Sequence, residues 1–145
     1  MLSFCAMIAE EPLDVVGFTV YTVENAYYDD GELIVFTNVT SNIGGHFQPA
    51  TSSFLCPVTG VYYFSLSIAN INSNYGVNAH ITKEELILVS AHSRPDGATH
   101  SATAAVTTCE RGQSVWIQAD GDNRGVYGNP DLLLSSFSGF LLYVV

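Results

Sequence analysis

Two polar segments carry the side chains best suited to bind a ligand. They span 69–78 (ANINSNYGVN) and 120–131 (DGDNRGVYGNPD). The residues expected to contact a ligand are Asn74, Tyr75, Asp120, Asp122, Asn123, Arg124 and Tyr127. Amides and carboxylates pair with sugar hydroxyls, while an aromatic ring covers the apolar face of a sugar ring. Both segments therefore predict a carbohydrate site; the alternative is that their Asn, Asp and Gly residues simply form turns.

Arg124 gives the second segment a further property. A lone guanidinium among acidic residues can bind the carboxylate of an acidic sugar such as a sialic acid. A third candidate patch comprises Tyr27, Tyr28, Asp29 and Asp30, whose simplest role is a tight hairpin turn.

Catalytic and zinc-binding patterns are weak in this sequence. It has no Gly-x-Ser-x-Gly motif, and Cys56 and Cys109 fall inside strand-like runs, where burial would make their thiols inert. The four histidines include no His-x-His or i, i+4 pair, so a zinc site built by one chain is not expected. We therefore predict that the protein is not an enzyme and requires no cofactor.

The elements that must position these residues have the pattern of β-strands. Nearly every apolar run is short, rich in β-branched or aromatic residues, and bounded by turn residues. The run 60–71 alternates between two faces over its whole length, which predicts a long central strand. Further strands are expected at 18–23, 33–36, 83–91, 101–108, 114–119 and 136–145, with a hairpin turn at Asp30-Gly31 between the first two. About eight to ten strands predict an all-β sandwich or jelly roll.

Large aromatic side chains should fill the space between the two sheets. The expected set is Phe54, Tyr62, Phe64, Trp116, Phe137 and Phe140. A side chain of this size contributes about 1.5–3 kcal/mol when buried. Gly139 should lie where a neighbouring ring comes close. The nearly all-apolar run 136–145 should be covered on both faces.

Charge and composition exclude several classes of partner. The 145 residues include 14 acidic and 4 basic side chains, for a formal net charge of −10. No basic surface can therefore neutralise nucleic acid or an acidic membrane. No run approaches the ~20 apolar residues of a membrane-spanning helix, so membrane insertion is not expected. Because 48% of the residues are apolar and only 12% are charged, part of the apolar excess could belong to an interior shared between chains.

The sequence constrains cysteine pairing, glycosylation and domain limits less tightly than it constrains the partners. Cys5, Cys56 and Cys109 cannot all pair within one chain, and the sequence leaves their pairing open. The triplet Asn38-Val39-Thr40 makes Asn38 a candidate N-glycosylation site. Residues 1–12 are expected to be an N-terminal extension or the remnant of a clipped signal peptide, and residues 13–145 one globular domain.

Three stretches resemble the signature segments of a known family. They are GGHFQPATSSFLCPVTGVYYFSLSI (44–68), ERGQSVWIQADG (110–121) and SSFSGFLLY (135–143). Together they resemble the globular head domain of the complement C1q family, within the C1q and tumour necrosis factor-like superfamily. Because the sequence has no Gly-X-Y repeat, it looks like stalkless, head-only members such as invertebrate C1q-domain immune proteins. The resemblance implies an all-β, ten-stranded jelly-roll sandwich that assembles as a homotrimer.

The resemblance also bears on metal binding and symmetry. Some members hold calcium near the trimer apex through aspartates in the stretch that corresponds to about 90–102. This sequence has His92 and His100 there, with Asp96 alone in the turn, so calcium is disfavoured. A residue near a threefold axis is presented three times. His92 or His100 could therefore form a ring of imidazoles at the trimer axis, whose protonation would make assembly pH-sensitive.

The function that the resemblance implies is that of a secreted binding module without catalysis. We predict a pattern-recognition, lectin-like protein that binds carbohydrate or microbial surface ligands, including sialylated or other acidic sugars. Three symmetric copies would raise its affinity. Two alternatives stay open: a ligand for a protein receptor, as in cerebellin-like or tumour necrosis factor-like members, and a structural component of the extracellular matrix.

Overall fold

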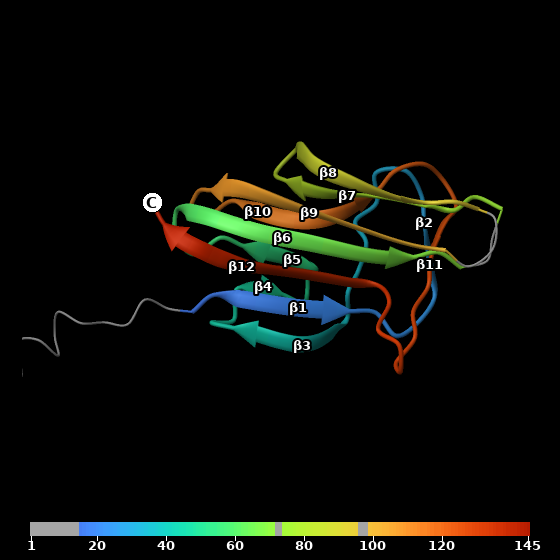
Figure 1. Ribbon diagram of the computed structural model, residues 1–145, viewed down its shortest axis with the longest axis horizontal. Coiled ribbons are helices and arrows are strands. Elements are labelled where there is room, and N and C mark those ends of the chain that lie inside the picture. The colour runs from blue at the N-terminus through green and yellow to red at the C-terminus, as the bar shows by residue number, and fades with distance from the viewer. Residues whose placement is uncertain (1–14, 72–73, 96–98) are drawn as a thin grey trace, which may run out of the picture.

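The chain folds into two five-stranded antiparallel sheets packed face to face (Figure 1). The computed structural model describes residues 15–71, 74–95 and 99–145, and none of these is helical. The first sheet has the order β3 (Asn38–Ile43), β1 (Gly17–Tyr21), β12 (Ser136–Val144), β6 (Gly60–Ala69) and β9 (His100–Cys109). The second has the order β4 (Phe47–Gln48), β5 (Ser53–Leu55), β10 (Ser114–Ala119), β7 (Val77–Lys83) and β8 (Leu86–Ser93). A separate two-stranded ribbon joins β2 (Ala26–Tyr28) to β11 (Arg124–Val126).

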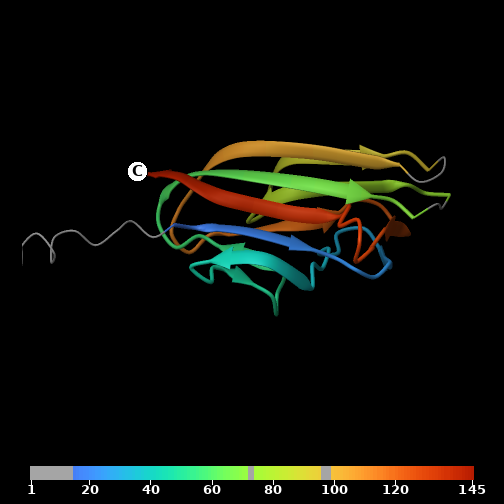
Figure 2. The same cartoon turned by 60° about the horizontal axis from the view of Figure 1, so that its bottom comes forward.

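The predicted ten-stranded sandwich is therefore confirmed, with the ribbon as an addition. β6 is the long central strand that its alternating sequence predicts. Its side chains at Tyr62, Phe64, Leu66 and Ile68 are fully buried, and β12 and β9 pair with it on either side. Figure 2 shows these strands side by side in one layer.

A cluster of phenylalanines fills the space between the sheets. The ring of Phe18 lies 5.1 Å from that of Phe47, 5.0 Å from that of Phe54 and 4.9 Å from that of Phe137, measured between centroids. A Cβ atom at Gly139 would lie only 2.5 Å from Cδ1 of Phe64. The prediction that a ring closely approaches Gly139 is confirmed, and any larger residue there would displace the cluster.

Two of the expected core aromatics face outward instead. Trp116 lies between Val115 and Ile117, which are fully buried, so alternation along β10 turns its half-buried ring to the outer face. Phe140 is 44% exposed and packs on the outer face against Tyr63, at a centroid distance of 5.3 Å. Both faces of β12 carry apolar residues, so alternation alone does not say which face is buried. In β10 the face of Trp116 also carries Ser114 and Gln118, so only the size of the ring favours its burial.

The expected hairpin around Asp30-Gly31 is wrong, although its turn is present. The amide of Glu32 donates to the carbonyl of Asp29 at 3.0 Å, and Gly31 has φ +82°. The two expected strands nevertheless do not pair with each other. β1 pairs with β12 and β3, whereas 33–36 is not a strand and lies beside β10, where Leu33 bridges to Gln118. Local chemistry therefore determines the turn, whereas distant partners determine the pairing of the strands.

The expected strand 83–91 and the expected burial of the last strand also need correction. β7 ends at Lys83 and β8 begins at Leu86, so 84–85 form a tight connection in which Glu84 has φ +54°. In the C-terminal strand, Phe140, Leu142 and Val144 are all at least 40% exposed. Within one chain, β12 is therefore covered on its inner face and bare on its outer face.

Cys56 and Cys109 form a disulfide, so they are not the inert free thiols that their surroundings suggested. Cys109 ends β9 in the first sheet, and Cys56 follows β5 in the second. The bond thus links the two sheets covalently. Cys5 lies outside the described residues, as do residues 1–12, for which an extension or signal remnant is expected.

The two ends of the sandwich differ in what they contain. At one end, here called the terminal end, Gly60 pairs with both Cys109 and Val144, and Val16 accepts a backbone hydrogen bond from Leu141. The opposite end, called the apical end, carries the β2–β11 ribbon and the loops that follow β6 and β10 (Figures 1 and 2). The described residues contain no helix that is long and apolar enough to cross a membrane.

Candidate functional site

The two polar segments singled out from the sequence meet at the apical end, where Arg124 joins them. Its Nε donates to the carbonyl of Asp120 at 2.7 Å, and its Nη1 donates to the carbonyl of Tyr75 at 2.5 Å. The guanidinium lies against Gly121, which has φ +89°, and a Cβ atom at that position would collide with it. Arg124 therefore fastens the segment around Tyr75 to the segment that follows β10.

The turn at 29–32 is attached to the same segment. The Oδ1 atom of Asp30 accepts from the amide of Gly121 at 2.8 Å, and the Oδ1 atom of Asp122 accepts from the amide of Asp30 at 3.1 Å. The Oδ1 atom of Asp29 accepts from the amide of Asn123 at 3.2 Å. All three candidate patches thus form one structure, which we call the apical clasp: residues 27–32, 74–76 and 120–125.

The apical clasp includes two exposed tyrosine rings. Tyr75 is 53% exposed and Tyr27 is 61% exposed. Tyr27 is paired with Gly125, and a Cβ atom at Gly125 would lie 2.9 Å from Cε1 of Tyr27. The absence of a side chain at Gly125 lets this ring lie against the backbone, which holds it in place while one side of it stays exposed.

Asp120 presents its carboxylate at the edge of the apical clasp. The side chain is 53% exposed, and its Oδ2 atom lies 3.6 Å from Nε2 of His80. His80 is held in turn by Ser90, whose Oγ lies 2.6 Å from Nδ1. The backbone amide of Asp120 also donates to the carbonyl of Asn78 at 2.9 Å. Asp120 is therefore a positioned, solvent-accessible hydrogen-bond acceptor.

Tyr127 is separated from the other predicted ligand-binding residues. It lines an apical pocket of about 270 Å³, which His100 also lines. The remaining lining residues are Ala69, Asn70, Thr99, Leu132 and Leu134. Sequence reasoning missed Thr99, Leu132 and Leu134. The signal that could have pointed to the leucines is the apolar run 132–134, which lies in a connection rather than in a strand.

The other predicted residues have diverse surroundings. Asn74 is exposed and, among the described residues, has no side-chain hydrogen bond. His92, on β8, contacts the side-chain oxygen of Asn78, whereas His100 begins β9. Asn38 starts β3 and accepts from Oγ1 of Thr37 at 2.8 Å. The axial role of the two histidines and the glycosylation of Asn38 stay predictions.

Metal ligands do not gather in the described part of the chain. There, no group of three or more His, Cys, Asp or Glu side chains is placed to hold a metal ion. Asp96, the acidic residue of the stretch discussed for calcium, lies outside the described residues.

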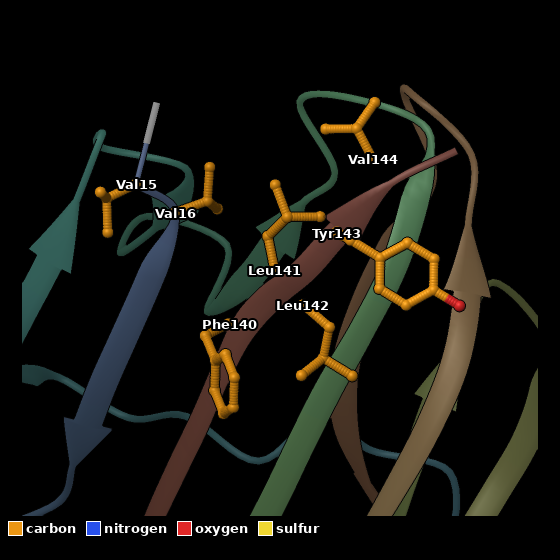
Figure 3. A pocket seen from close by; sticks show the side chains of 7 residues that line it. All are labelled: Val15, Val16, Phe140, Leu141, Leu142, Tyr143 and Val144. Carbon is orange, nitrogen blue, oxygen red and sulfur yellow. The ribbon is translucent and has the colours of Figure 1, made fainter. Parts of the chain in front are cut away.

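The terminal end carries an apolar groove of about 490 Å³ (Figure 3). It is lined by Val15, Val16 and the consecutive residues 140–144. This groove continues the exposed outer face of β12 and lacks the polar groups of the apical clasp. Its composition suits apolar contact with protein rather than recognition of a polar ligand.

Comparison with known proteins identifies similar sequences and structures. The family model described as C1q domain matches residues 17–142. Complement C1q tumor necrosis factor-related protein 7 of Mus musculus is 30% identical over 142 residues, covering 97% of this chain and 47% of the mouse protein. Complement C1q tumor necrosis factor-related protein 2 of Homo sapiens is 27% identical over 112 residues, covering 76% of this chain and 39% of the human protein. The chain thus spans less than half the length of these two relatives.

Solved structures show the same fold at lower sequence identity. The globular domain of zebrafish complement 1qA protein has a TM-score of 0.73 at 22% identity, covering 90% of this chain and 99% of that domain. The Eiger TNF from S. frugiperda also has a TM-score of 0.73, at 12% identity, with 92% and 96% coverage.

Proposed function

Because this chain belongs to the C1q domain family, we propose that it is a secreted, trimeric module that recognises surface carbohydrate through its apical end. The C1q domain is a ligand-binding domain, and the carbohydrate assignment is the further step. The observation that carries it is the apical clasp, where exposed carboxylates and amides border two tyrosine rings. Sugars are bound by such a combination of planar hydrogen-bonding groups and an apolar ring surface.

Arg124 contributes to this surface chiefly as a structural link. Its Nε and Nη1 atoms already donate to the carbonyls of Asp120 and Tyr75, so a carboxylated sugar would have to approach its Nη2 side. The chain also carries a net charge of −10, which opposes anionic ligands. Neutral sugars are therefore favoured over acidic ones as ligands of the apical clasp.

The outer face of the first sheet supports the trimeric part of the proposal. Ile43, Val106, Phe140 and Leu142 are each at least 44% exposed there, and the apolar groove adjoins them. Trimers are typical of the C1q and tumour necrosis factor-like families, and a second copy of this chain would cover that apolar surface. Three linked sites would raise the affinity for a repetitive surface well above that of one site.

Substitution at this face tests the assembly. Val106→Glu should convert the trimer to monomers, measured by sedimentation equilibrium, because it places a charge within an apolar interface. Leu55→Glu is the matched control, since Leu55 is 41% exposed and belongs to the second sheet. A trimer that survives Val106→Glu would contradict this arrangement.

The disulfide supports the secreted part of the proposal. Cys56 and Cys109 join the two sheets, and such bonds persist in oxidising compartments rather than in the cytosol.

Glycan-array binding tests the carbohydrate assignment. The purified chain should bind a subset of glycans, and Tyr75→Ala and Asp120→Ala should each weaken that binding about tenfold or more. Arrays run with and without a chelator would show whether calcium takes part. If no glycan is bound by a correctly assembled protein, the carbohydrate proposal is wrong.

Binding to a protein receptor is the second candidate function. Leu132 is 61% exposed and Leu133 is 39% exposed beside the apical pocket, and exposed leucines are typical of protein-binding surfaces. In that case the protein should bind cells after their surface glycans have been removed by glycosidases. Leu133→Glu should abolish that binding while leaving any glycan binding intact.

A further inference from the structure

The apical pocket that contains Tyr127 has mostly apolar walls and few polar groups. Ala69, Leu132 and Leu134 contribute apolar surface. The side chain of Asn70 is committed elsewhere: its Nδ2 donates to the carbonyl of Arg94 at 2.9 Å and its Oδ1 accepts from the amide of Thr99 at 2.6 Å. The hydroxyl of Thr99 likewise donates within this network, to Oδ1 of Asn70 and to the carbonyl of Arg94. Among the lining side chains, the hydroxyl of Tyr127 and the imidazole of His100 are left to orient a ligand.

A small hydrogen-bond network determines which nitrogen of His100 carries the hydrogen. Ser67 donates its hydroxyl hydrogen to the carbonyl of Leu134 at 2.8 Å. The Oγ of Ser67 must therefore accept from Nε2 of His100, which lies 2.5 Å away. The carbonyl of Leu134, 3.2 Å from Nε2, also acts only as an acceptor. Neutral His100 thus keeps its hydrogen on Nε2, and its Nδ1 is a hydrogen-bond acceptor without a partner among the described residues.

Tyr127, in contrast, offers a hydrogen-bond donor. Its hydroxyl oxygen accepts from Nδ2 of Asn129 at 3.0 Å. The orientation of that amide is determined by its Oδ1 atom, which accepts from the backbone amides of Asp131 and Leu132 at 2.8 and 3.0 Å. Because Asn129 is the donor in this hydrogen bond, the hydroxyl of Tyr127 does not use its own hydrogen there. That hydrogen remains available to donate to a ligand.

The pocket therefore combines one donor, one acceptor and an apolar wall. An acetamido group has the matching features: its carbonyl accepts, its N–H donates and its methyl group is apolar. We propose that this pocket binds the acetamido group of an N-acetylated sugar, with the carbonyl on Tyr127, the N–H on Nδ1 of His100 and the methyl group against Leu132 and Leu134. This assignment rests on the proposed carbohydrate function. The volume of about 270 Å³ is close to the lower limit of typical small-molecule sites, roughly 300 Å³, and suits a single sugar unit.

Titration calorimetry of the full chain with simple sugars tests the proposal. Methyl N-acetylglucosaminide and methyl N-acetylgalactosaminide should bind at least tenfold more tightly than methyl glucoside and methyl glucosaminide, which lack the acetyl group. N-acetylglycine methylamide, an acetamido group without a sugar, should bind at least tenfold more weakly than the acetamido sugars. Equal affinity for this compound would overturn the assignment to sugars.

Two variants place the binding in this pocket. Tyr127→Phe keeps the ring but removes the donor, so it should weaken binding of the acetamido sugars about tenfold. Tyr143→Phe, at the terminal end, is the matched control, since Tyr143 is 62% exposed and far from this pocket, and it should leave their binding unchanged. An unaltered affinity in Tyr127→Phe would overturn the proposal, as would equal binding of acetylated and non-acetylated sugars.

The failure of this inference is distinguishable from that of the proposed function. If glycans are bound on the array without preference for acetamido groups, the pocket assignment is wrong and the carbohydrate function stands. If no glycan is bound at all, both are wrong.

Discussion

The terminal and apical ends of the sandwich are held together by different kinds of interaction. At the terminal end, the disulfide links the sheets, and the pairing of β6 with β9 and β12 continues to Gly60. At the apical end, side chains bond to backbone groups of distant segments, as Arg124 does at Tyr75 and Asn70 at Thr99. The terminal end is thus secured covalently and by sheet pairing, and the apical end by polar contacts.

This difference explains where a ligand can be recognised. A disulfide and a sheet ladder leave few hydrogen-bonding groups for a partner. A polar network also holds its loops in place, but it leaves groups such as the Asp120 carboxylate and the Tyr127 hydroxyl accessible. The rigid strands therefore hold the apical loops in position, and the loops supply the hydrogen-bonding groups that can contact a ligand.

The largest effect should follow from removal of the disulfide. The double variant Cys56→Ala, Cys109→Ala should lose about 4 kcal/mol of unfolding free energy, because the bond closes a loop with a sequence separation of 53 residues. Denaturant unfolding of the wild type and the variant gives this value. Wild-type protein under reducing conditions is the control and should approach the variant. A loss below about 1 kcal/mol would show that the terminal end does not depend on its covalent link.

A smaller effect is expected from Asn70→Ala at the apical end. Asn70 is 1% exposed, and its truncation leaves the amide of Thr99 without its acceptor and the carbonyl of Arg94 with the hydroxyl of Thr99 as its remaining donor. Denaturant unfolding should show a loss of about 2–3 kcal/mol. Asn74→Ala is the control, since Asn74 is exposed, and should change stability by less than about 0.5 kcal/mol. Equal effects of the two variants would contradict a structural role for Asn70.

Arg124→Ala should have a still smaller effect on overall stability and a local effect on the loops. Its two hydrogen bonds link half-exposed segments, so about 1–2 kcal/mol should be lost. Hydrogen exchange should accelerate in residues 74–80 and 120–124 but not near Cys109. Arg111→Ala, at an exposed position near the terminal end, should leave both measurements unchanged. Faster exchange spread evenly over the molecule would refute the distinction between the ends.

The smallest expected effect is on the pH dependence of stability in alkaline solution. It concerns two tyrosines, one at the apical end and one in the core. Burial raises the pKa of Tyr28 at the apical end, with the charge of Glu32 adding to it, and burial also raises the pKa of Tyr62 in the core. A raised pKa in the folded state contributes stability below the unfolded value of about 10, and this contribution is lost as pH rises through the folded pKa. Between pH 9 and 11, wild-type unfolding free energy should therefore fall more steeply than that of Tyr28→Phe or Tyr62→Phe. Identical slopes in all three proteins would contradict this linkage.

The sequence predicts the strands better than their partners. Alternation along 60–69 places Tyr62 and Phe64 correctly because one face of that strand is much more apolar than the other. The same reasoning misplaces Phe140 because apolar residues occupy both faces of β12. Trp116 is misplaced because its size is weighed above the alternation of β10, in which Val115 and Ile117 form the apolar face. The turn at Asp29–Glu32 is predictable from local chemistry, whereas the pairing of β2 with β11 depends on residues almost one hundred positions apart.

In the candidate site, too, the sequence predicts the segments but not the contacts between them. Sequence identifies both polar segments and the patch at 27–30, because their residue types are unusual in so apolar a chain. It does not reveal that Arg124 and Asp30 bind these segments together, since hydrogen bonds between loops depend on the completed fold. Nor does it predict that Tyr127 and His100 line one pocket, because that pocket forms only where the connection before β12 passes the ends of β6 and β9.

The position of the two ends of the described chain has a practical consequence for attachment. Val145 donates to the carbonyl of Thr59, and Val16 accepts from Leu141, so residues 16 and 145 both lie at the terminal end. Figure 1 shows the apical loops at the end of the molecule opposite to the C-terminus. Anchoring the C-terminus to a sensor surface, a bead or a membrane lipid would therefore point the apical loops outward. Immobilisation of this kind should preserve ligand capture without a search for a favourable orientation.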